Sequence, residues 1–507
     1  YYKIKFDACY IDDAVRSNSK WFPYNKGFEF RKWYGNNDYV VNWENDGFEI
    51  RNFVDEKGKL RSRPQNTDFY FRESASWSLV TSSMAAFRYK LPGNIFDVAG
   101  MSFFSDNNLF YLLALCNTKV VMEVLKVIAP TINYQCGDIA NIPVLIEEAK
   151  KPLIISTVQN NIALSKTDWN SYETSWDFKK HPLLRSVSRL ADDYTAWKSE
   201  CEQRFLQLKA NEEELNRIFI DIYGLQDELT PDVAEKDVTV HRIFDTKDDV
   251  PDTMQGSSYV RTKRDEIVSL LSYAVGCMFG RYSLDVDGLA YAGGEWDASK
   301  YKTFQPDRDG ILPITDEEYL QDDIISRLCD WLKAAYGADT LEENLDFIAN
   351  ALGGKGDSSR EIIRNYFLKD FFKDHCKTYQ KRPIYWLFDS GKQDGFKALI
   401  YLHRYTPDTI GNIRVDYLHK MQRVYESEIG RMQDMIDHST NAREVAASTK
   451  RKEKLQKQLK ECRDYDEMIA HLALSRIELD LDDGVKVNYE KIQTAGDGKQ
   501  YPVLAKI

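Results

Sequence analysis

Basic and amide side chains alternate with aromatic ones between residues 20 and 90, an arrangement suited to binding nucleic acid. Lysine and arginine neutralise phosphates, and serine can donate a hydrogen bond to them. Arginine, glutamine and asparagine can make paired hydrogen bonds to the edges of guanine and adenine. The residues that we predict to contact DNA are Lys20, Lys26, Arg31, Lys32, Trp33, Arg61, Arg63, Gln65, Asn66, Arg72, Trp77, Ser78 and Arg88. The alternative interpretation is an ordinary aromatic β-core with charged rims.

One stretch concentrates the groups that read base edges. Residues 55–59 (Asp-Glu-Lys-Gly-Lys) have the composition of a hairpin tip, and residues 60–66 follow as a loop in which only Leu60 favours burial. We predict that Arg63 in this loop binds a guanine in the major groove, and that Lys26 and Lys32 contact phosphates.

Short strands and one long helix are expected to position these side chains. Residues 39–43, 48–53 and 68–71 are aromatic and β-branched and lie between Gly, Asn and Asp turns, which is typical of strands. A helix is predicted from Phe110 to Ala129, ended by the following proline, and a short strand over 138–144.

The rest of the sequence is mainly helical in pattern. Residues 147–185 hold aromatic residues among polar ones, and we expect this connector to pack against a neighbouring element. Residues 211–222 have helical spacing of apolar residues. Three further helices are predicted to begin at capping boxes, Thr315 with Glu318, Thr340 with Glu343 and Ser358 with Glu361. Apolar residues three and four apart on both sides of a polar turn at 438–441 predict two antiparallel helices over 415–475, a structural arm.

These patterns predict an α+β fold class: a mixed, β-rich domain followed by a predominantly α-helical domain with a long antiparallel helical hairpin. The predicted boundaries are 1–146 for the β-rich domain, 147–200 for a connector, 201–412 for the helical domain, 413–478 for the hairpin and 479–507 for a C-terminal tail.

Composition limits the class of protein. The 507 residues carry a formal net charge of −12, yet residues 1–92 hold 15 basic and 12 acidic side chains, so the predicted DNA-binding part has a local excess of 15 − 12 = 3 positive charges. No apolar stretch approaches the roughly 18 residues needed to span a membrane. Eight dispersed cysteines favour a reducing cytoplasm. Because the sequence begins with Tyr1, we expect a piece of a longer protein.

Complete catalytic motifs are absent from the sequence. No proline follows Asn or Asp, so the [DN]-P-P-[YFW] turn of adenine-N6 methyltransferases is missing, and neither Gly293-Gly294 nor residues 353–358 form a cofactor or phosphate loop. Pro231-Asp232 with Asp245-Thr246-Lys247 matches a metal-nuclease pattern, but a chain this rich in acid and lysine produces such a match by chance. The His375-Cys376 pair is interpreted as two helix residues.

Several strings point to a known family. Residues 21–35 (WFPYNKGFEFRKWYG) resemble the opening of the target recognition domain in large adenine-specific DNA methyltransferases, best of all the PglX-type enzymes of BREX (bacteriophage exclusion) systems, which are related to type IIG restriction–modification enzymes. Residues 106–144 are similar to the closing half of that domain. Residues 164–169 and 173–178 are similar to the segment that follows it, and residues 211–220 and 381–388 resemble the C-terminal helical region, so the resemblance extends over essentially the whole chain.

The resemblance implies a function for each half of the parent enzyme. Residues 1–146 would be a DNA target recognition domain that selects an adenine in double-stranded DNA. An N-terminal methyltransferase domain, whose motifs are missing here, would bind S-adenosylmethionine and methylate the flipped base. We therefore expect no cofactor and no catalytic residue in this chain itself. Other BREX proteins and phage DNA-mimic inhibitors are the further partners that the family implies.

Two alternatives remain from other classes. A recognition domain joined to a helical hairpin also resembles a stand-alone type I DNA specificity subunit, although a second recognition domain is not visible. The other alternative is a metal-dependent nuclease built on Asp232, Asp245 and Lys247.

Overall fold

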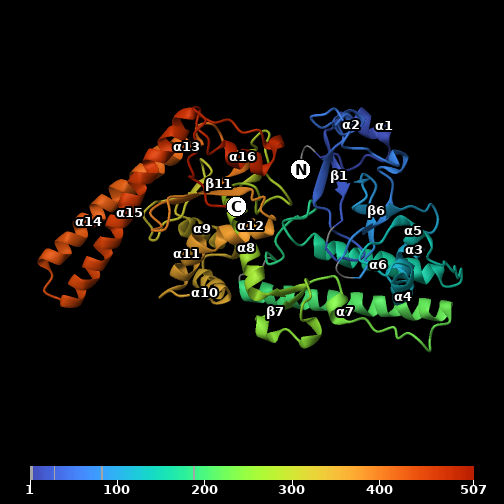
Figure 1. The fold of residues 1–507 in the computed structure, drawn as a ribbon. Helices are drawn as coiled ribbons and strands as arrows, with labels where there is room; N and C mark the ends of the chain where they lie inside the picture. Colours follow the sequence, from blue (N-terminus) through green and yellow to red (C-terminus); the bar gives the residue numbers. More distant parts are fainter. Residues whose placement is uncertain (1–3, 28, 82–83, 186–188) are drawn as a thin grey trace. The chain divides into compact units, whose positions relative to one another are not determined.

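The computed structural model describes residues 4–27, 29–81, 84–185 and 189–507; Phe28, within the segment 21–35 noted above, lies outside the described residues. The chain divides into two compact units. Unit 1 is Tyr1–Lys179 with Thr195–Lys263, and unit 2 is Lys180–Tyr194 with Arg264–Ile507. Figure 1 colours the chain along the sequence, with unit 1 mainly in blue to green and unit 2 mainly in yellow to red.

Unit 1 contains small sheets in place of one large one. In the first sheet, β1 (Trp21–Asn25) pairs antiparallel with β2 (Tyr39–Asn42) and parallel with β5 (Ile95–Phe96). In the second, β3 (Ser74–Ser78) lies between β4 (Arg88–Lys90) and β6 (Gly100–Phe103), all antiparallel. A close backbone approach joins the two sheets, since a Cβ on Gly100 would lie 2.5 Å from the carbonyl oxygen of Asn25. Only glycine fits there.

Helices share one core with the second sheet. Trp77 of β3 and Phe87, just before β4, pack in a cluster with Tyr111, Ile154 and Phe219 from three helices, whereas Phe22 and Ile95 of the first sheet lie in a separate apolar cluster. The remaining elements of unit 1 are α1 (Ile11–Arg16), α2 (Glu44–Arg51), η1 (Thr67–Phe69), α3 (Leu109–Cys116), α4 (Lys119–Ile128), α5 (Cys136–Ala140), α6 (Lys151–Trp169), most of α7 (Leu190–Tyr223), η2 (Glu235–Asp237), β7 (Arg242–Phe244), η3 (Lys247–Asp249), η4 (Asp252–Met254) and β8 (Val260–Thr262). The predicted connector is thus largely α6, which packs into this core as expected.

Two of the predicted strands are wrong. Residues 48–53 belong mostly to α2, whose start contains Asn45, Asp46 and Gly47 at positive φ. A Cβ on Gly47 would lie 2.6 Å from the Trp43 ring, so this left-handed turn seats its backbone directly on the indole. Residues 68–71 form the end of a short 3₁₀ turn, η1, because Asn66 ahead of it is left-handed and its carbonyl accepts from Phe69.

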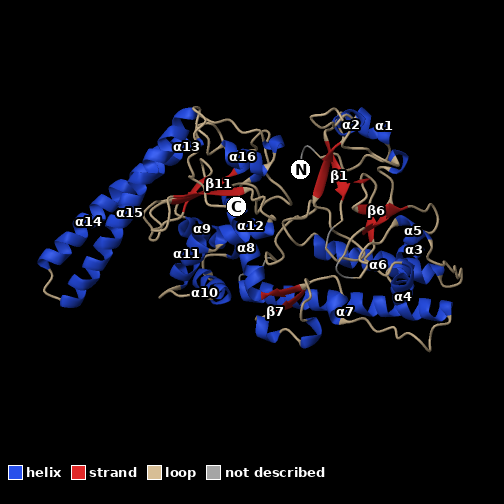
Figure 2. Ribbon diagram, viewed as in Figure 1, coloured by secondary structure: helices blue, strands red, loops and turns tan. Residues whose placement is uncertain are grey.

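The closing half of the β-rich region also differs from the prediction. The single helix expected over 110–129 is broken between α3 and α4, because the amide of Asn117 bonds the backbone N–H and C=O of Phe87, each at 3.0 Å. The strand predicted over 138–144 is wrong: this segment contains the end of α5. That helix begins with a reciprocal cap between Gln135 and Asp138. Figure 2 shows how few strands (red) remain among the helices of this unit.

Unit 2 is helical around a small antiparallel sheet. Its sheet has the order β10 (Tyr385–Asp389), β11 (Lys397–Tyr401) and β9 (Ile311–Pro313), with Trp386, Phe388 and Ile400 buried. The other elements are α8 (Lys263–Met278), η5 (Ala298–Lys300), α9 (Ile324–Tyr336), α10 (Leu341–Leu352), α11 (Ser359–Lys369), α12 (Phe371–Thr378), η6 (Leu402–Arg404), α13 (Thr409–Asn412), the π-helical turn η7 (Ile413–Leu418), α14 (His419–His438), α15 (Ala442–Ser475), η8 (Leu481–Asp483) and α16 (Val485–Lys491). The predicted α+β fold class, with small sheets early and helices dominating later, is confirmed.

The predicted helical hairpin is confirmed as α14 and α15, which run side by side in Figure 1. Met421, Tyr425 and Met432 of α14 are buried together with Leu455 and Leu459 of α15 in one apolar cluster. The spacing of three and four residues therefore placed the seam correctly.

The structure confirms two of the three predicted helix starts. Helices α10 and α11 follow Thr340 and Ser358. The start predicted at Thr315 is wrong, because the hydroxyl of Thr315 donates to Asp323, and Asp323 caps α9 by accepting from the Ile325 N–H at 3.0 Å. Among the helices of the described ranges, none is both long and apolar enough to cross a membrane.

Candidate nucleic-acid interface

Six of the thirteen predicted DNA-contacting residues are buried in unit 1. Their relative exposures range from 1% to 8%, which leaves no surface for a phosphate or a base edge to approach. These six are Arg31, Lys32, Trp33, Trp77, Ser78 and Arg88. The contacts that they make inside the unit explain why the sequence places charge there.

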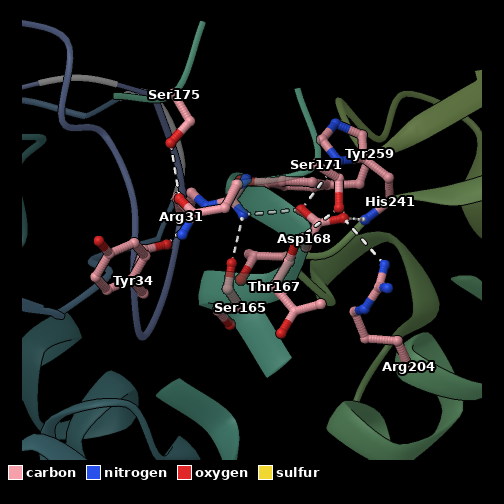
Figure 3. Close-up of polar contacts among 12 residues, drawn as sticks. Arg31, Tyr34, Ser165, Thr167, Asp168, Ser171, Ser175, Arg204, His241 and Tyr259 are labelled. Atoms are coloured by element: carbon pink, nitrogen blue, oxygen red, sulfur yellow. Dashed lines mark hydrogen bonds and ion pairs between the residues drawn. The ribbon is translucent and has the colours of Figure 1, made fainter. Parts of the chain in front are cut away.

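Arg31 belongs to a buried ion cluster (Figure 3). Its guanidinium donates to the carboxylate of Asp168 at 2.8 Å and to the Ser165 carbonyl at 3.3 Å, and lies over the Trp169 ring. Asp168 is completely buried on α6 and also receives the backbone N–H of His241 at 2.9 Å. Although burial favours the neutral acid, His241, then Arg31 and Arg204, hold the pKa of Asp168 well below its usual range.

A second buried pair joins the β-rich segment to α7. Lys32 donates from Nζ to one oxygen of Glu212 at 2.7 Å, and the indole N–H of Trp33 donates to the other at 2.7 Å. Trp33 has a φ of 67°, so the Glu212 contact helps to hold it in the left-handed region. The pair fixes the backbone between β1 and β2.

Arg88 also makes its hydrogen bonds inside unit 1. It donates to the Arg31 carbonyl at 3.0 Å and to the Ser78 hydroxyl at 3.3 Å, and burial lowers its pKa to about 10. The buried members of the predicted set therefore position the fold, and the DNA contact stays a prediction for the seven residues that reach solvent.

The solvent-accessible members lie on loops and strand ends of unit 1. Lys20 and Lys26 stand over the rings of Trp21 and Tyr39, and Arg72 pairs with Asp106 at 3.0 Å. The remaining four belong to the predicted loop: Arg61, Arg63, Gln65 and Asn66, all exposed.

The loop at 60–66 is fixed at both ends. Val54 and Leu60 form a β-bridge below the turn, and Asp55 accepts from the backbone N–H groups of Lys57 and Lys59 at 3.0 and 2.9 Å. At its far end, Asn66 begins the 3₁₀ turn η1. Arg63 makes no ion pair or hydrogen bond within the ranges that the structure describes, so its guanidinium is available to a ligand.

Next to this loop lies an open groove of about 910 Å³ within unit 1. Arg63, Gln65 and Asn66 line it together with aromatic rings that sequence reasoning did not associate with them. The rings are Tyr24, Trp43, Phe69, Tyr70, Phe96 and Phe104. No spacing rule connects these positions, because five separate segments of the chain supply them.

The residues of the nuclease pattern and of the His375-Cys376 pair make contacts within the fold. Asp245 pairs with Lys198 at 2.8 Å and with Lys263 at 3.3 Å, and within the described ranges no group of three or more His, Cys, Asp or Glu side chains could hold a metal ion. The Nε2 of His375 accepts from the backbone N–H groups of Ile384 and Tyr385, both at 3.1 Å, while burial raises the pKa of the Cys376 thiol to about 11.

Comparison with known proteins finds extended similarity to part of two adenine-specific methyltransferases. No family model matches it. It is 44% identical over 505 residues to the adenine-specific methyltransferase PglX of Lacticaseibacillus casei (strain Zhang), an alignment that covers 97% of this chain and 40% of that protein. It is 38% identical over 499 residues to the adenine-specific methyltransferase BrxX of Escherichia coli O9:H4 (strain HS), covering 95% of this chain and 40% of BrxX.

The chain is therefore homologous to a part of the PglX and BrxX methyltransferases. It spans 40% of the length of these two curated relatives.

Proposed function

We propose that this chain recognises a short duplex DNA site on behalf of an adenine-N6 DNA methyltransferase of a BREX phage-defence system, with residues 1–146 as the target recognition domain. The homology to PglX and BrxX supports the enzyme class. The observation that carries the DNA-reading part is the loop 60–66, which is anchored at both ends. It presents the exposed amides of Gln65 and Asn66 together with Arg63, which has no ion pair or hydrogen bond among the described residues.

The loop's chemistry matches direct readout in a major groove. An arginine makes two hydrogen bonds to guanine, and an asparagine or glutamine makes two to adenine. Since the hairpin below the loop already holds its base, these side chains lose little backbone freedom on binding. Lys26, which is exposed at the end of β1, supplies a phosphate contact that positions the duplex without reading it.

The methyl donor is assigned to another part of the enzyme. Binding of S-adenosylmethionine in a Rossmann-like domain uses a glycine-rich turn between a strand and a helix. Here Gly353 and Gly354 follow a helix, α10, and Gly293 and Gly294 precede no helix longer than the turn η5. Neither glycine pair therefore has the form of a cofactor turn, and we propose that an N-terminal methyltransferase domain holds both the cofactor and the flipped adenine.

We expect Arg63→Ala to relax sequence recognition. The loss of one bidentate arginine–guanine contact should weaken binding to the cognate duplex by about 1–3 kcal/mol and leave binding to scrambled duplex nearly unchanged. The cognate site is obtained by mapping methylated adenines in cells that carry the full-length enzyme, and the two duplexes are then compared by titration at two salt concentrations.

Two further variants, each of which removes one positive charge, are compared with Arg63→Ala. Lys26→Ala should weaken both duplexes alike and reduce the slope of binding against salt by about one charge. Lys57→Ala removes an exposed charge from the tip of the same hairpin and should change binding least. If Arg63→Ala weakens both duplexes equally, the loop positions the backbone without reading bases; if none of the three changes binding, the DNA lies on another face.

A further inference from the structure

We infer that the aromatic groove beside loop 60–66 receives an unstacked nucleobase from the bound DNA strand. This inference rests on the proposed DNA recognition and extends it from the edges of paired bases to the face of an unpaired one. It is carried by three properties of the groove: a run of ring contacts, polar atoms without partners in the described part of the chain, and an arginine in the lining.

The rings form a continuous wall. Successive centroids are 5.1 Å apart from Trp43 to Tyr70 and 5.0 Å from Tyr70 to Phe96, and the run continues at 5.6 Å to Phe104 and 5.1 Å to Phe69. Phe69 is the end of this run and remains 41% exposed. An exposed ring that is already held by a neighbouring ring offers a flat face to a base at small entropic cost.

Polar atoms in the same groove lack partners. The indole N–H of Trp43 and the hydroxyl of Ser102 are buried, and neither makes a hydrogen bond within the described part of the chain. Buried polar groups in proteins are nearly always bonded, so two unpaired groups in one groove point to a ligand with a hydrogen-bonding edge. The amides of Gln65 and Asn66 add donors and acceptors at the surface.

The charged groups at the groove are of both signs. Asp97 in the lining accepts from the Tyr24 hydroxyl and from the backbone N–H groups of Ala99 and Gly100, so its charge is engaged internally. Arg63, also in the lining, makes no ion pair or hydrogen bond within the described ranges and supplies the cation for a ligand attached to phosphate. Arg72, which pairs with Asp106, lies over the rings of Phe69 and Phe104 at 5.3 and 5.7 Å. A nucleotide combines a flat apolar face, a polar edge and an anionic link, and a volume of about 910 Å³ accommodates it. An apolar helix from a protein partner would leave Gln65, Asn66 and Ser102 unpaired.

The test compares two single-stranded 12-mers with the full chain by fluorescence anisotropy, one of mixed sequence and one in which every base is replaced by an abasic tetrahydrofuran residue. Because base stacking on an aromatic ring strengthens binding substantially, the mixed strand should bind at least roughly tenfold more tightly. Phe69→Ala should remove about tenfold of that difference and leave the abasic strand unaffected, whereas Phe69→Tyr retains the ring and the affinity.

Phe48→Ala is the matched control, since Phe48 is 62% exposed in unit 1 but does not line the groove. Equal binding of the mixed and abasic strands, or equal effects of Phe69→Ala and Phe48→Ala, would overturn the inference. In that case Arg63→Ala can still weaken binding to the cognate duplex and leave the scrambled duplex unchanged, which would leave the proposed function standing. A melting curve for each variant confirms that an exposed position has been changed without unfolding the unit.

Discussion

Asp168→Ala is expected to lower the free energy of unfolding of unit 1 by about 3–5 kcal/mol. The substitution leaves the Arg31 guanidinium buried at 3% exposure without its carboxylate, and it removes the partner of His241 and of Arg204, whose guanidinium lies 3.9 Å away. Desolvated charge without a counter-ion is among the largest single-site penalties in proteins. The loss is measured by urea denaturation followed by tryptophan fluorescence.

Asp245→Ala is the control for this experiment. It breaks ion pairs in the same unit, but the carboxylate is 45% exposed and we expect less than about 1 kcal/mol. Hydrogen exchange gives a local measurement, because the His241 N–H should lose protection when Asp168 is removed. Equal losses of stability from the two alanine variants would show that the buried cluster is not what holds the β-rich segment.

The pH dependence of the same variants tests the charge directly. The pKa of Asp168 is lowered in the folded protein, so its contribution is fully present above the unfolded value of about 4 and is lost as the pH falls toward the folded value. The stability difference between the wild type and Asp168→Asn should therefore be constant near neutral pH and shrink in acid. A difference that grows on acidification would mean that the carboxylate is not stabilised by its cationic neighbours.

Leu459→Asp should destabilise unit 2 by a comparable amount, about 3–5 kcal/mol. Leu459 is 8% exposed in the seam between α14 and α15, and the substitution combines the loss of buried apolar contacts with an unpaired charge. Circular dichroism at 222 nm against temperature records the change, since these two helices carry much of the helical signal.

Gln456→Asp is the matched control on the same helix. It introduces the same charge at an exposed position three residues away, so the difference between the two variants isolates burial. If Leu459→Asp melts like Gln456→Asp, the seam is not a source of stability. The hairpin would then be better explained as a surface for a partner.

The hairpin is the part of the fold that sequence alone determined most completely. Its apolar residues repeat every three or four positions over many turns, and a pattern of that length has no other compact solution than a buried seam. The loop at 60–66 was also placed correctly, because turn chemistry at Asp55 to Lys59 is local: the aspartate bonds the backbone a few residues away. The strand β2 was found from its β-branched and aromatic composition.

Tertiary structure decided what the charged residues of the β-rich region do. Arg31, Lys32 and Arg88 have the composition of a DNA-binding surface, but their partners Asp168, Glu212 and Ser78 are chosen by packing. Two of those partners lie more than a hundred residues along the chain. Two short aromatic segments were wrongly predicted as strands for the same reason. Residues 48–53 and 68–71 have strand composition, yet Gly47 against the Trp43 ring and the left-handed Asn66 turn them elsewhere.

The groove beside the loop is likewise a product of tertiary structure. Its rings come from separate segments that share no common period in the sequence. Periodicity therefore could not predict that these rings lie together in one groove. Local hydrogen bonds and long repeats can be inferred from residue order because they act over a few positions along the chain. Burial of a charge and assembly of a pocket depend on which distant segments fold together, and only the folded chain specifies that.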